Sequence, residues 1–407
     1  MSDITLIHNA RLLSTVQAQT ERYRVAIAQE KIISIEPMSE SAIASNSTDV
    51  IDDVIDDVID IEGDWLTLGA VDLQINGALG LAFPDLRPQH FEKLEQICDL
   101  LWQQGVDSFC PTLVTTSLAN FHGALSAIQQ FQQQQKDTPR TAKILGAHLE
   151  GPFLNKAKRG AHPEQFLQSL SLENVKTVVG DFAETISIMT LAPECAVDEA
   201  VVEWLVAQGI TVSLGHSLAT AEQASRAFAQ GATMVTHAFN AMPSLHHREP
   251  GILGAAIATP HVHSGFIADG QHICKTMLDL LLRSGRGSRE NDFSGLFLVS
   301  DALSPLGLPD GKYPWDEREI EVINGTARLA DGTLSGTTLP LIKGAQNLVE
   351  WDLCSAQEAI ALVTQAPRRA IGLANTIKGH STHLLRWRQT DERHLAWSRV
   401  EKNASTS

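Results

Sequence analysis

Three side chains that readily bind metal ions each stand at the end of a short apolar run. They are Glu150, His216 and His237, in the stretches Gly-Ala-His-Leu-Glu, Val-Ser-Leu-Gly-His and Met-Val-Thr-His. Such runs predict parallel strands buried on both faces, and in such sheets the chemistry lies at the carboxyl ends of the strands. One carboxylate and two imidazoles are typical of a catalytic zinc site, which leaves a coordination position for water. The sequence therefore predicts a divalent metal ion, with Zn²⁺ favoured and Fe²⁺ also suited.

A fourth polar residue, Asp301, ends the apolar run Gly-Leu-Phe-Leu-Val-Ser in the same way. Gln74 and Asn76 follow an earlier run, at the point where barrel hydrolases with two metal ions usually carry His-x-His. Neutral amides are poorer zinc ligands than imidazoles, and the run 186–191 is not followed by a lysine that could bridge two ions. We therefore expect one metal ion, with Gln74 and Asn76 beside the site rather than as ligands.

Three further residues are candidates for holding a substrate. His272, just beyond the run 264–268, could donate a hydrogen bond to a substrate carbonyl. Arg248 is the strongest cation expected on the catalytic side, and a guanidinium group binds phosphate through two parallel hydrogen bonds. His162 is a weaker candidate for binding an anion or a hydroxyl. The pair in His261-Val-His263 has ligand spacing, but it begins a strand and so belongs to the face that serves stability.

The elements that must position these residues alternate between strand and helix patterns. Eight such units predict a (β/α)₈ TIM-type barrel over residues 67–372. Residues 1–66 and 373–407 show short strand patterns with one solvent-exposed face, and we expect them to pair into a small β-sandwich domain. The eight predicted barrel strands are 70–75, 106–112, 143–149, 186–191, 210–215, 232–236, 264–268 and 295–300.

Residues 49–60 repeat Asp-Val-Ile-Asp in tandem. These aspartates are neither grouped with histidines nor spaced like those of a calcium-binding loop. We interpret the segment as an extended strand or loop with solvated aspartates and no catalytic role.

The composition excludes several classes of protein. A formal charge of −17 over 407 residues argues against binding to nucleic acid or to an anionic membrane surface. The five cysteines are widely spaced, as expected in a reducing compartment, and the first residues lack a signal-peptide pattern. No apolar run reaches the length that spans a membrane. We expect a cytoplasmic protein that acts on a small molecule.

From about residue 60 to 372 the chain resembles the N-acetylglucosamine-6-phosphate deacetylases of the amidohydrolase superfamily. The resemblance implies that Glu150, His216 and His237 bind the metal and that Asp301 is the catalytic acid and base. The substrate contacts that it implies are His272, Arg248, His162, Asn240 and Ala241, with Arg248 serving the neighbouring subunit of a homodimer. It rests on the motifs His-Leu-Glu-Gly-Pro (148–152), Gly-His-Ser (215–217), Thr-His-x-x-Asn-Ala-Met-Pro (236–243), His-Arg-Glu-Pro-Gly (247–251), Ala-Asp-Gly-x-His (268–272), Asp-Ala (301–302) and Gly-Thr-Leu-Ser-Gly (332–336).

The expected reaction is hydrolysis of the acetamido group of an amino-sugar phosphate, as part of amino-sugar catabolism. Asp301 would take a proton from the attacking water and then protonate the departing amine. Two alternatives stay open: a barrel amidohydrolase that acts on a cyclic amide or an N-acyl amino acid, and a non-enzymatic scaffold built on the same barrel. The sequence does not distinguish a glucosamine from a galactosamine substrate.

Overall fold

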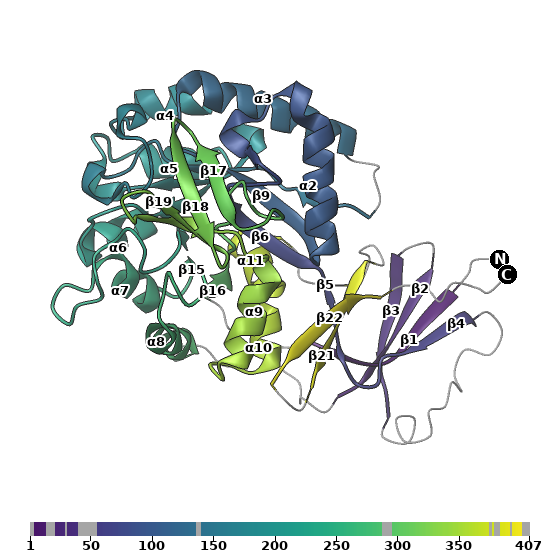
Figure 1. Cartoon of the computed structure of the whole chain (residues 1–407). Coiled ribbons are helices and arrows are strands. Elements are labelled where there is room, and N and C mark those ends of the chain that lie inside the picture. Colours follow the sequence, from purple (N-terminus) through teal and green to yellow (C-terminus); the bar gives the residue numbers. More distant parts are fainter. Residues whose placement is uncertain are drawn as a thin grey trace.

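The chain folds into a parallel β-barrel wrapped by helices, with a small β domain beside it (Figure 1). This is a computed structural model, and it describes residues 4–13, 21–28, 31–39, 55–135, 140–286, 295–373, 377, 383–390 and 393–400. The (β/α)₈ fold predicted from the sequence is confirmed.

All eight predicted barrel strands form, and neighbouring strands are parallel. The third is interrupted: β10 (Lys143–Ile144) pairs with β9 before the chain continues into β11. A parallel bridge between Ile75 and Ala302 joins the last strand segment to the first. The strands are β6 (Ala70–Ile75), β9 (Val106–Val114), β11 (Ala147–Glu150), β12 (Ile186–Leu191), β13 (Thr211–Leu214), β14 (Met234–Val235), β15 (His263–Phe266) and β16 (Leu296–Leu298).

Helices cover the outside of the barrel, and two of them begin at capping boxes that the sequence predicts. The side chains of Thr220 and Ser355 each accept a bond from the backbone N–H three residues later. No helix in the described ranges is long and apolar enough to cross a membrane. The helices are α2 (Phe91–Gln103), α3 (Leu118–Gln135), α4 (Leu172–Val179), α5 (Val201–Ala207), α6 (Ala221–Ala229), α7 (Gly251–Ala258), α8 (Lys275–Arg286), α9 (Leu341–Glu350), α10 (Ala356–Val363) and α11 (Gln365–Ala370).

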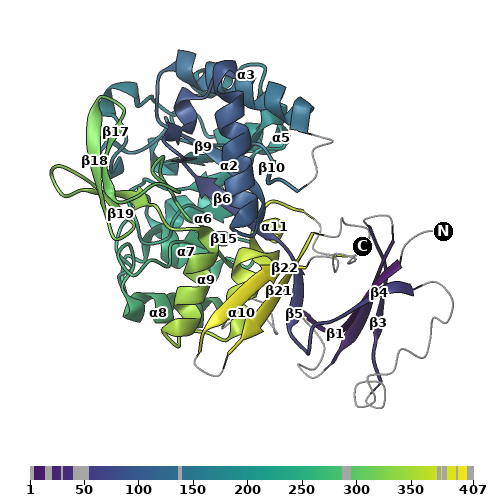
Figure 2. The ribbon, with the colours of Figure 1, turned by 45° about the vertical axis from the view of Figure 1, so that its right-hand side comes forward.

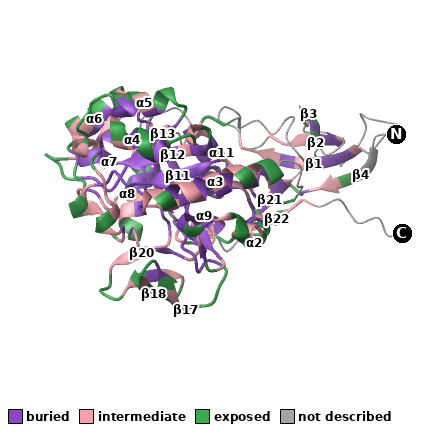
Figure 3. Ribbon diagram, turned by 90° about the horizontal axis from the view of Figure 1, so that it is seen from above, coloured by how far each residue is buried: buried purple, intermediate pink, exposed green. Residues whose placement is uncertain are grey.

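One end of the barrel is filled with apolar side chains. Val71, Ile188 and Phe297 from three of the strands pack with Ala366 and Ala370 of α11. The barrel interior is accordingly buried when the molecule is seen from above (Figure 3). Because this end is plugged, a substrate can enter only from the other end, where the carboxyl ends of the strands lie.

Both ends of the described chain contribute to the small β domain, as predicted. Its seven strands follow the order β22-β21-β5-β1-β2-β3, with β4 also pairing with β1. Residues 55–60 of the Asp-Val-Ile-Asp repeat form β4, and residues 49–54 lie outside the described residues. The exact domain boundaries stay a prediction. The strands are β1 (Ile4–Leu12), β2 (Tyr23–Ala28), β3 (Lys31–Pro37), β4 (Ile55–Asp60), β5 (Trp65–Leu68), β21 (Leu384–Gln389) and β22 (Leu395–Arg399).

A four-stranded antiparallel sheet after β16 is absent from the sequence prediction. In Figure 1 it lies in front of the barrel, and in Figure 2 it stands at the barrel's outer edge, away from β1–β4. Ile320, Val322 and Ala327 alternate with exposed residues and form its own small core. Its strands are β17 (Gly311–Trp315), β18 (Arg318–Ile323), β19 (Thr326–Leu329) and β20 (Leu334–Thr337), and the short hairpin of β7 (Gly77–Ala78) and β8 (Leu81–Ala82) lies elsewhere, after β6.

Candidate active site

The three predicted metal-binding side chains converge at the open end of the barrel. Glu150 Oε1 lies 3.2 Å from His216 Nε2 and 3.0 Å from His237 Nε2, and the two Nε2 atoms are 3.0 Å apart. All three residues are buried. Ligand atoms that surround a zinc ion tetrahedrally at about 2.0–2.1 Å are separated by about 3.3 Å. The three atoms therefore form a triangle of the size that one such ion requires.

The backbone turns sharply where the strands deliver these groups. Glu150 is the last residue of β11, while His216 and His237 each follow a strand by two residues. His216, His237 and Asp301 have φ angles of 48°, 27° and 47°, in the left-handed region that residues other than glycine rarely adopt. Such strained positions persist only where surrounding contacts fix them, and they are frequent at functional sites.

Hydrogen bonds to the second ring nitrogen distinguish the histidines from one another. His216 Nδ1 donates to the carbonyl of Lys158 at 2.8 Å, so its Nε2 keeps a lone pair for a metal ion. Single ligand atoms of Glu150, His162 and His216 also lie within 4.8 Å of one another, which makes His162 a geometrical alternative as ligand. However, the backbone N–H of Thr115 donates to His162 Nδ1, so the neutral ring carries its proton on Nε2. That nitrogen suits a donor better than a ligand.

The ionisable groups of the site shift one another's pKa values. Burial by itself would raise the pKa of Glu150, but His216 and His237 outweigh it and hold the pKa well below its usual range. Burial opposes a charge on His237, yet the bond and charge of Glu150 raise its pKa. Burial lowers the pKa of His162 to about 3, which keeps that ring neutral. The site is therefore built around one carboxylate and the positive charge that it attracts.

Asp301 faces this group from the other side of the barrel opening. Its Oδ1 accepts from Asn76 Nδ2 at 2.8 Å and from Gln74 Nε2 at 3.3 Å, and Gln74 Nε2 also donates to Glu150 Oε1 at 3.0 Å. Burial and the charge of Glu150 raise the pKa of Asp301. Gln74 thus orients both carboxylates, and Asn76 orients that of Asp301. An aspartate with a raised pKa can accept a proton and later return it.

His272 is oriented toward the same space by a carboxylate. Its Nδ1 donates to Asp269 Oδ2 at 2.7 Å, and the other oxygen of Asp269 accepts the backbone N–H groups of Gln271 and His272. Burial raises the pKa of Asp269, but the bonds from His272 outweigh this effect and lower it. With Nδ1 engaged, His272 presents Nε2 to the pocket.

These residues line one cavity of about 690 Å³. Its wall includes predicted site residues from six parts of the chain. The sheet β17–β20, which the sequence analysis did not predict, supplies another part of the wall. Lys158, in the loop that also carries His162, contributes the one ammonium or guanidinium group among the described lining residues, and the sequence prediction missed it. The predicted residues that line the cavity are Asn76, Glu150, His162, His216, His237, Asn240, Ala241, His272 and Asp301, and those missed include Thr115, Asn120, Phe166, Trp315, Asp316 and Glu317.

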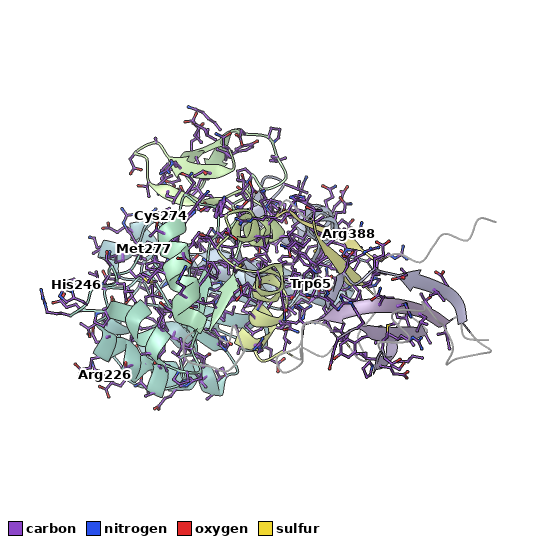
Figure 4. The ribbon with its side chains drawn as sticks, turned by 90° about the horizontal axis from the view of Figure 1, so that it is seen from below. Trp65, Arg226, His246, Cys274, Met277 and Arg388 are labelled. Carbon is purple, nitrogen blue, oxygen red and sulfur yellow. The ribbon has the colours of Figure 1, made fainter. Side chains whose placement is uncertain are left out.

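Arg248 is the predicted substrate contact that the described chain does not bring to the cavity. It is exposed, and its guanidinium contacts the ring of His247 at 2.9 Å. The neighbouring His246 projects from the outer edge of the barrel (Figure 4). The segment 244–249 therefore points outward from its own barrel, where a second molecule could meet it. His261 and His263, which have ligand spacing in the sequence, do not line the cavity, as predicted.

Known proteins resemble the chain over most of its length. N-acetylglucosamine-6-phosphate deacetylase from Bos taurus is 37% identical over 322 residues, covering 77% of this chain and 76% of the relative. N-acetylgalactosamine-6-phosphate deacetylase from Escherichia coli O157:H7 is 30% identical over 370 residues, covering 91% and 90%. The crystal structure of N-acetylglucosamine-6-phosphate deacetylase from Pasteurella multocida has a TM-score of 0.79 at 27% identity, covering 98% of this chain and all of that one. No family model matches the chain.

The buried carboxyl of Asp72 should make the stability of the fold depend on pH. Asp72 Oδ1 accepts the backbone N–H groups of Gln74 and Ser300, and burial raises its pKa to about 7. Between its usual value of 3.8 and about 7, the unfolded chain has released this proton while the folded chain keeps it. The stabilisation from Asp72 is therefore present at low pH and is lost as the pH rises through this window.

We predict that Asp72→Asn gains stability relative to the wild type as the pH rises from 3.8 to about 7. The gain is at most about 1.4 kcal/mol per pH unit. Denaturant unfolding of both proteins across this range measures it. Glu203→Gln, which changes an exposed carboxylate on α5, is the control, because this side chain is in contact with water in the folded and the unfolded chain alike. A constant difference between Asp72→Asn and the wild type would contradict the shifted pKa.

Proposed function

The chain belongs to the N-acetylglucosamine-6-phosphate deacetylase family, and on that basis we propose that it hydrolyses the acetamido group of N-acetyl-D-glucosamine 6-phosphate. The products are D-glucosamine 6-phosphate and acetate, as expected of an enzyme of amino-sugar catabolism. The identity to named deacetylases over three quarters of the chain supports this proposal. The five free cysteines fit a cytoplasmic location, which is part of the proposal.

The observation that carries the proposal is the triangle of Glu150, His216 and His237 with Asp301 opposite. We assign the first three as ligands of one divalent ion, Zn²⁺ before Fe²⁺, because two imidazoles and a carboxylate suit zinc. When bound, the ion polarises the amide carbonyl and lowers the pKa of a water molecule. Gln74 and Asn76 offer amides where a second ion would need imidazoles, so one ion per subunit is proposed.

Asp301 moves the protons in the proposed reaction. Its Oδ1 is engaged by Asn76 and Gln74, which leaves Oδ2 to take a proton from the attacking water. Its raised pKa favours keeping that proton until the amide nitrogen needs it. The carboxyl then protonates the nitrogen, because an unprotonated amine anion is a very poor leaving group.

Two histidines hold the substrate in this proposal. His162 offers an Nε2–H donor to a sugar hydroxyl, since its Nδ1 is engaged by Thr115. His272, with Nδ1 bonded to Asp269, can donate from Nε2 when its ring carries both protons. Such a donor stabilises charge that develops on a substrate oxygen. Asn240 and Ala241 complete the proposed contacts from the cavity wall.

Phosphate recognition is proposed to involve a second subunit. The described cavity wall includes Asp85, Asp316 and Glu317, and Lys158 supplies its one ammonium or guanidinium group. A doubly charged phosphate would meet an unfavourable field there without a further cation. Arg248, exposed on a segment that points away from its own barrel, is suited to supply it to a neighbouring copy, so we propose a homodimer.

We predict that purified protein releases free amine from N-acetylglucosamine 6-phosphate and that a chelator abolishes the release. The galactosamine epimer is the second candidate substrate, because the galactosamine-specific relative covers 91% of the chain. Measuring kcat/KM on both 6-phosphates decides between them, and metal analysis of the same protein identifies the ion. Absence of amine release from either sugar, with metal bound, would reject the proposed function.

We predict that Asp301→Asn lowers kcat by roughly 10²–10⁴-fold, because the amide cannot accept the proton of water. Metal content and substrate binding should stay near those of the wild type. Amine release under substrate saturation measures the loss, and metal analysis of the variant is the control. Near-normal turnover would remove Asp301 from this role.

We predict that Arg248→Ala raises KM for the 6-phosphate far more than KM for unphosphorylated N-acetylglucosamine. The reason is that a guanidinium pairs with the phosphate and not with the neutral sugar. Arg248→Lys, which keeps the charge but loses the bidentate geometry, should fall between the two. Equal increases for both substrates would contradict a phosphate contact.

A further inference from the structure

One carboxylate outside the cavity wall ties the loop that carries His216 to the loop that bonds to it. Glu194 follows β12 in a short 3₁₀ turn, Pro193–Cys195. Its Oε2 accepts the hydroxyl of Ser217 at 2.5 Å, and its Oε1 accepts the backbone N–H of Leu218 at 2.5 Å. Asn155 Nδ2 donates to Oε1 from the other loop at 2.9 Å. Three donors from two loops therefore converge on one side chain.

The loop that carries Asn155 also bonds directly to His216. The backbone N–H of Asn155 donates to the carbonyl of His216 at 2.9 Å, and His216 Nδ1 donates to the carbonyl of Lys158 at 2.8 Å. Asn155 holds Lys158 in place, because its carbonyl accepts the Lys158 N–H at 2.8 Å. The position of the imidazole thus depends on the distance between the loops, and Glu194 fixes that distance.

We infer that Glu194 is a positioning residue that sets His216 for metal binding by holding residues 155 and 217–218 together. The inference rests on the proposed function, since it takes His216 as a ligand. Groups that orient a metal-binding histidine from behind contribute strongly to metal affinity, and their loss typically costs 10–100-fold. The direct partner of His216 Nδ1 is the backbone carbonyl of Lys158, which no substitution removes. We therefore assign the orienting role to Glu194, the side chain that holds the loop of Lys158.

Glu194→Gln tests the inference, because its amide keeps one acceptor oxygen and places an NH₂ group against donors. We expect the dissociation constant for Zn²⁺, measured by competition with a chromogenic chelator, to rise about tenfold or more. kcat at saturating metal and substrate should change much less, because Asp301 is held from the opposite side. Asp198→Asn, on the same connection, removes a carboxylate that bonds only to the N–H of Leu172 among the described contacts, and it should leave the constant unchanged.

Exchanging the amide of residue 155 and the carboxylate of residue 194 sharpens the test. Asn155→Asp alone sets two carboxylates 2.9 Å apart and should weaken zinc binding further than Glu194→Gln does. In Asn155→Asp with Glu194→Gln, the new amide can donate to the new carboxylate, so zinc binding should recover relative to Asn155→Asp. A purely structural role would lower the thermal midpoint without this reciprocal pattern in the zinc constant. Ser217→Ala, which removes one of the three donors, is the fallback if Glu194→Gln does not fold, and should show a smaller rise.

Two outcomes overturn the inference while the proposed function stands. One is a dissociation constant for Zn²⁺ of Glu194→Gln within about twofold of that of the wild type, against the larger loss expected. The other is a double variant that binds Zn²⁺ no more tightly than Asn155→Asp. If wild-type protein itself does not bind zinc or another divalent ion, the metal assignment fails and the inference fails with it.

Discussion

Two imidazole nitrogens and one carboxylate oxygen within 3.2 Å of one another, shielded from water, repel unless a positive charge lies between them. The raised pKa of His237 shows the same requirement, since a proton is one way to supply that charge. The surrounding bonds all act against this repulsion. Gln74 restrains Glu150, and the Lys158 carbonyl restrains His216. These contacts also hold the backbone at φ angles that are otherwise unfavourable. The polypeptide thus maintains an arrangement that only a cation makes favourable.

Closure of the barrel and placement of the Asp301 carboxylate depend on the same hydrogen bonds. The Asp301 N–H donates to the carbonyl of Gln74, and the Asn76 N–H donates to the carbonyl of Ala302. These bonds join the segment after β16 to β6, while the side chains of Gln74 and Asn76 bond to the Asp301 carboxylate. A change that loosens this junction would disturb the fold and the chemistry together. The junction therefore gives these two neutral amides a role that does not require them to bind an ion.

The sequence predicted the barrel strands and the four central residues because both follow from local pattern: a buried parallel strand is apolar, and its chemistry begins where it ends. The sheet β17–β20 was missed, although the alternation in Arg-Glu-Ile-Glu-Val-Ile at 318–323 is a strand signal. Lys158, Thr115 and Glu194 were missed for a different reason. Their roles depend on which loops lie next to each other, and no short-range pattern encodes that. Arg248 was found as a cation, but its distance from the cavity of its own chain is a property of the folded molecule.

The sheet β17–β20 differs from an ordinary surface insertion in how it is attached. Thr337, the last residue of β20, donates its N–H to the carbonyl of Asp301 at 3.0 Å and its hydroxyl to the carbonyl of Ser300 at 2.7 Å. The sheet also contributes Trp315 and Asp316 to the cavity wall. Replacing the whole sheet would therefore also change the backbone hydrogen bonds that hold residues 300 and 301. A change of cavity shape that leaves these bonds intact calls for single side-chain replacements on the face of the sheet that lines the cavity.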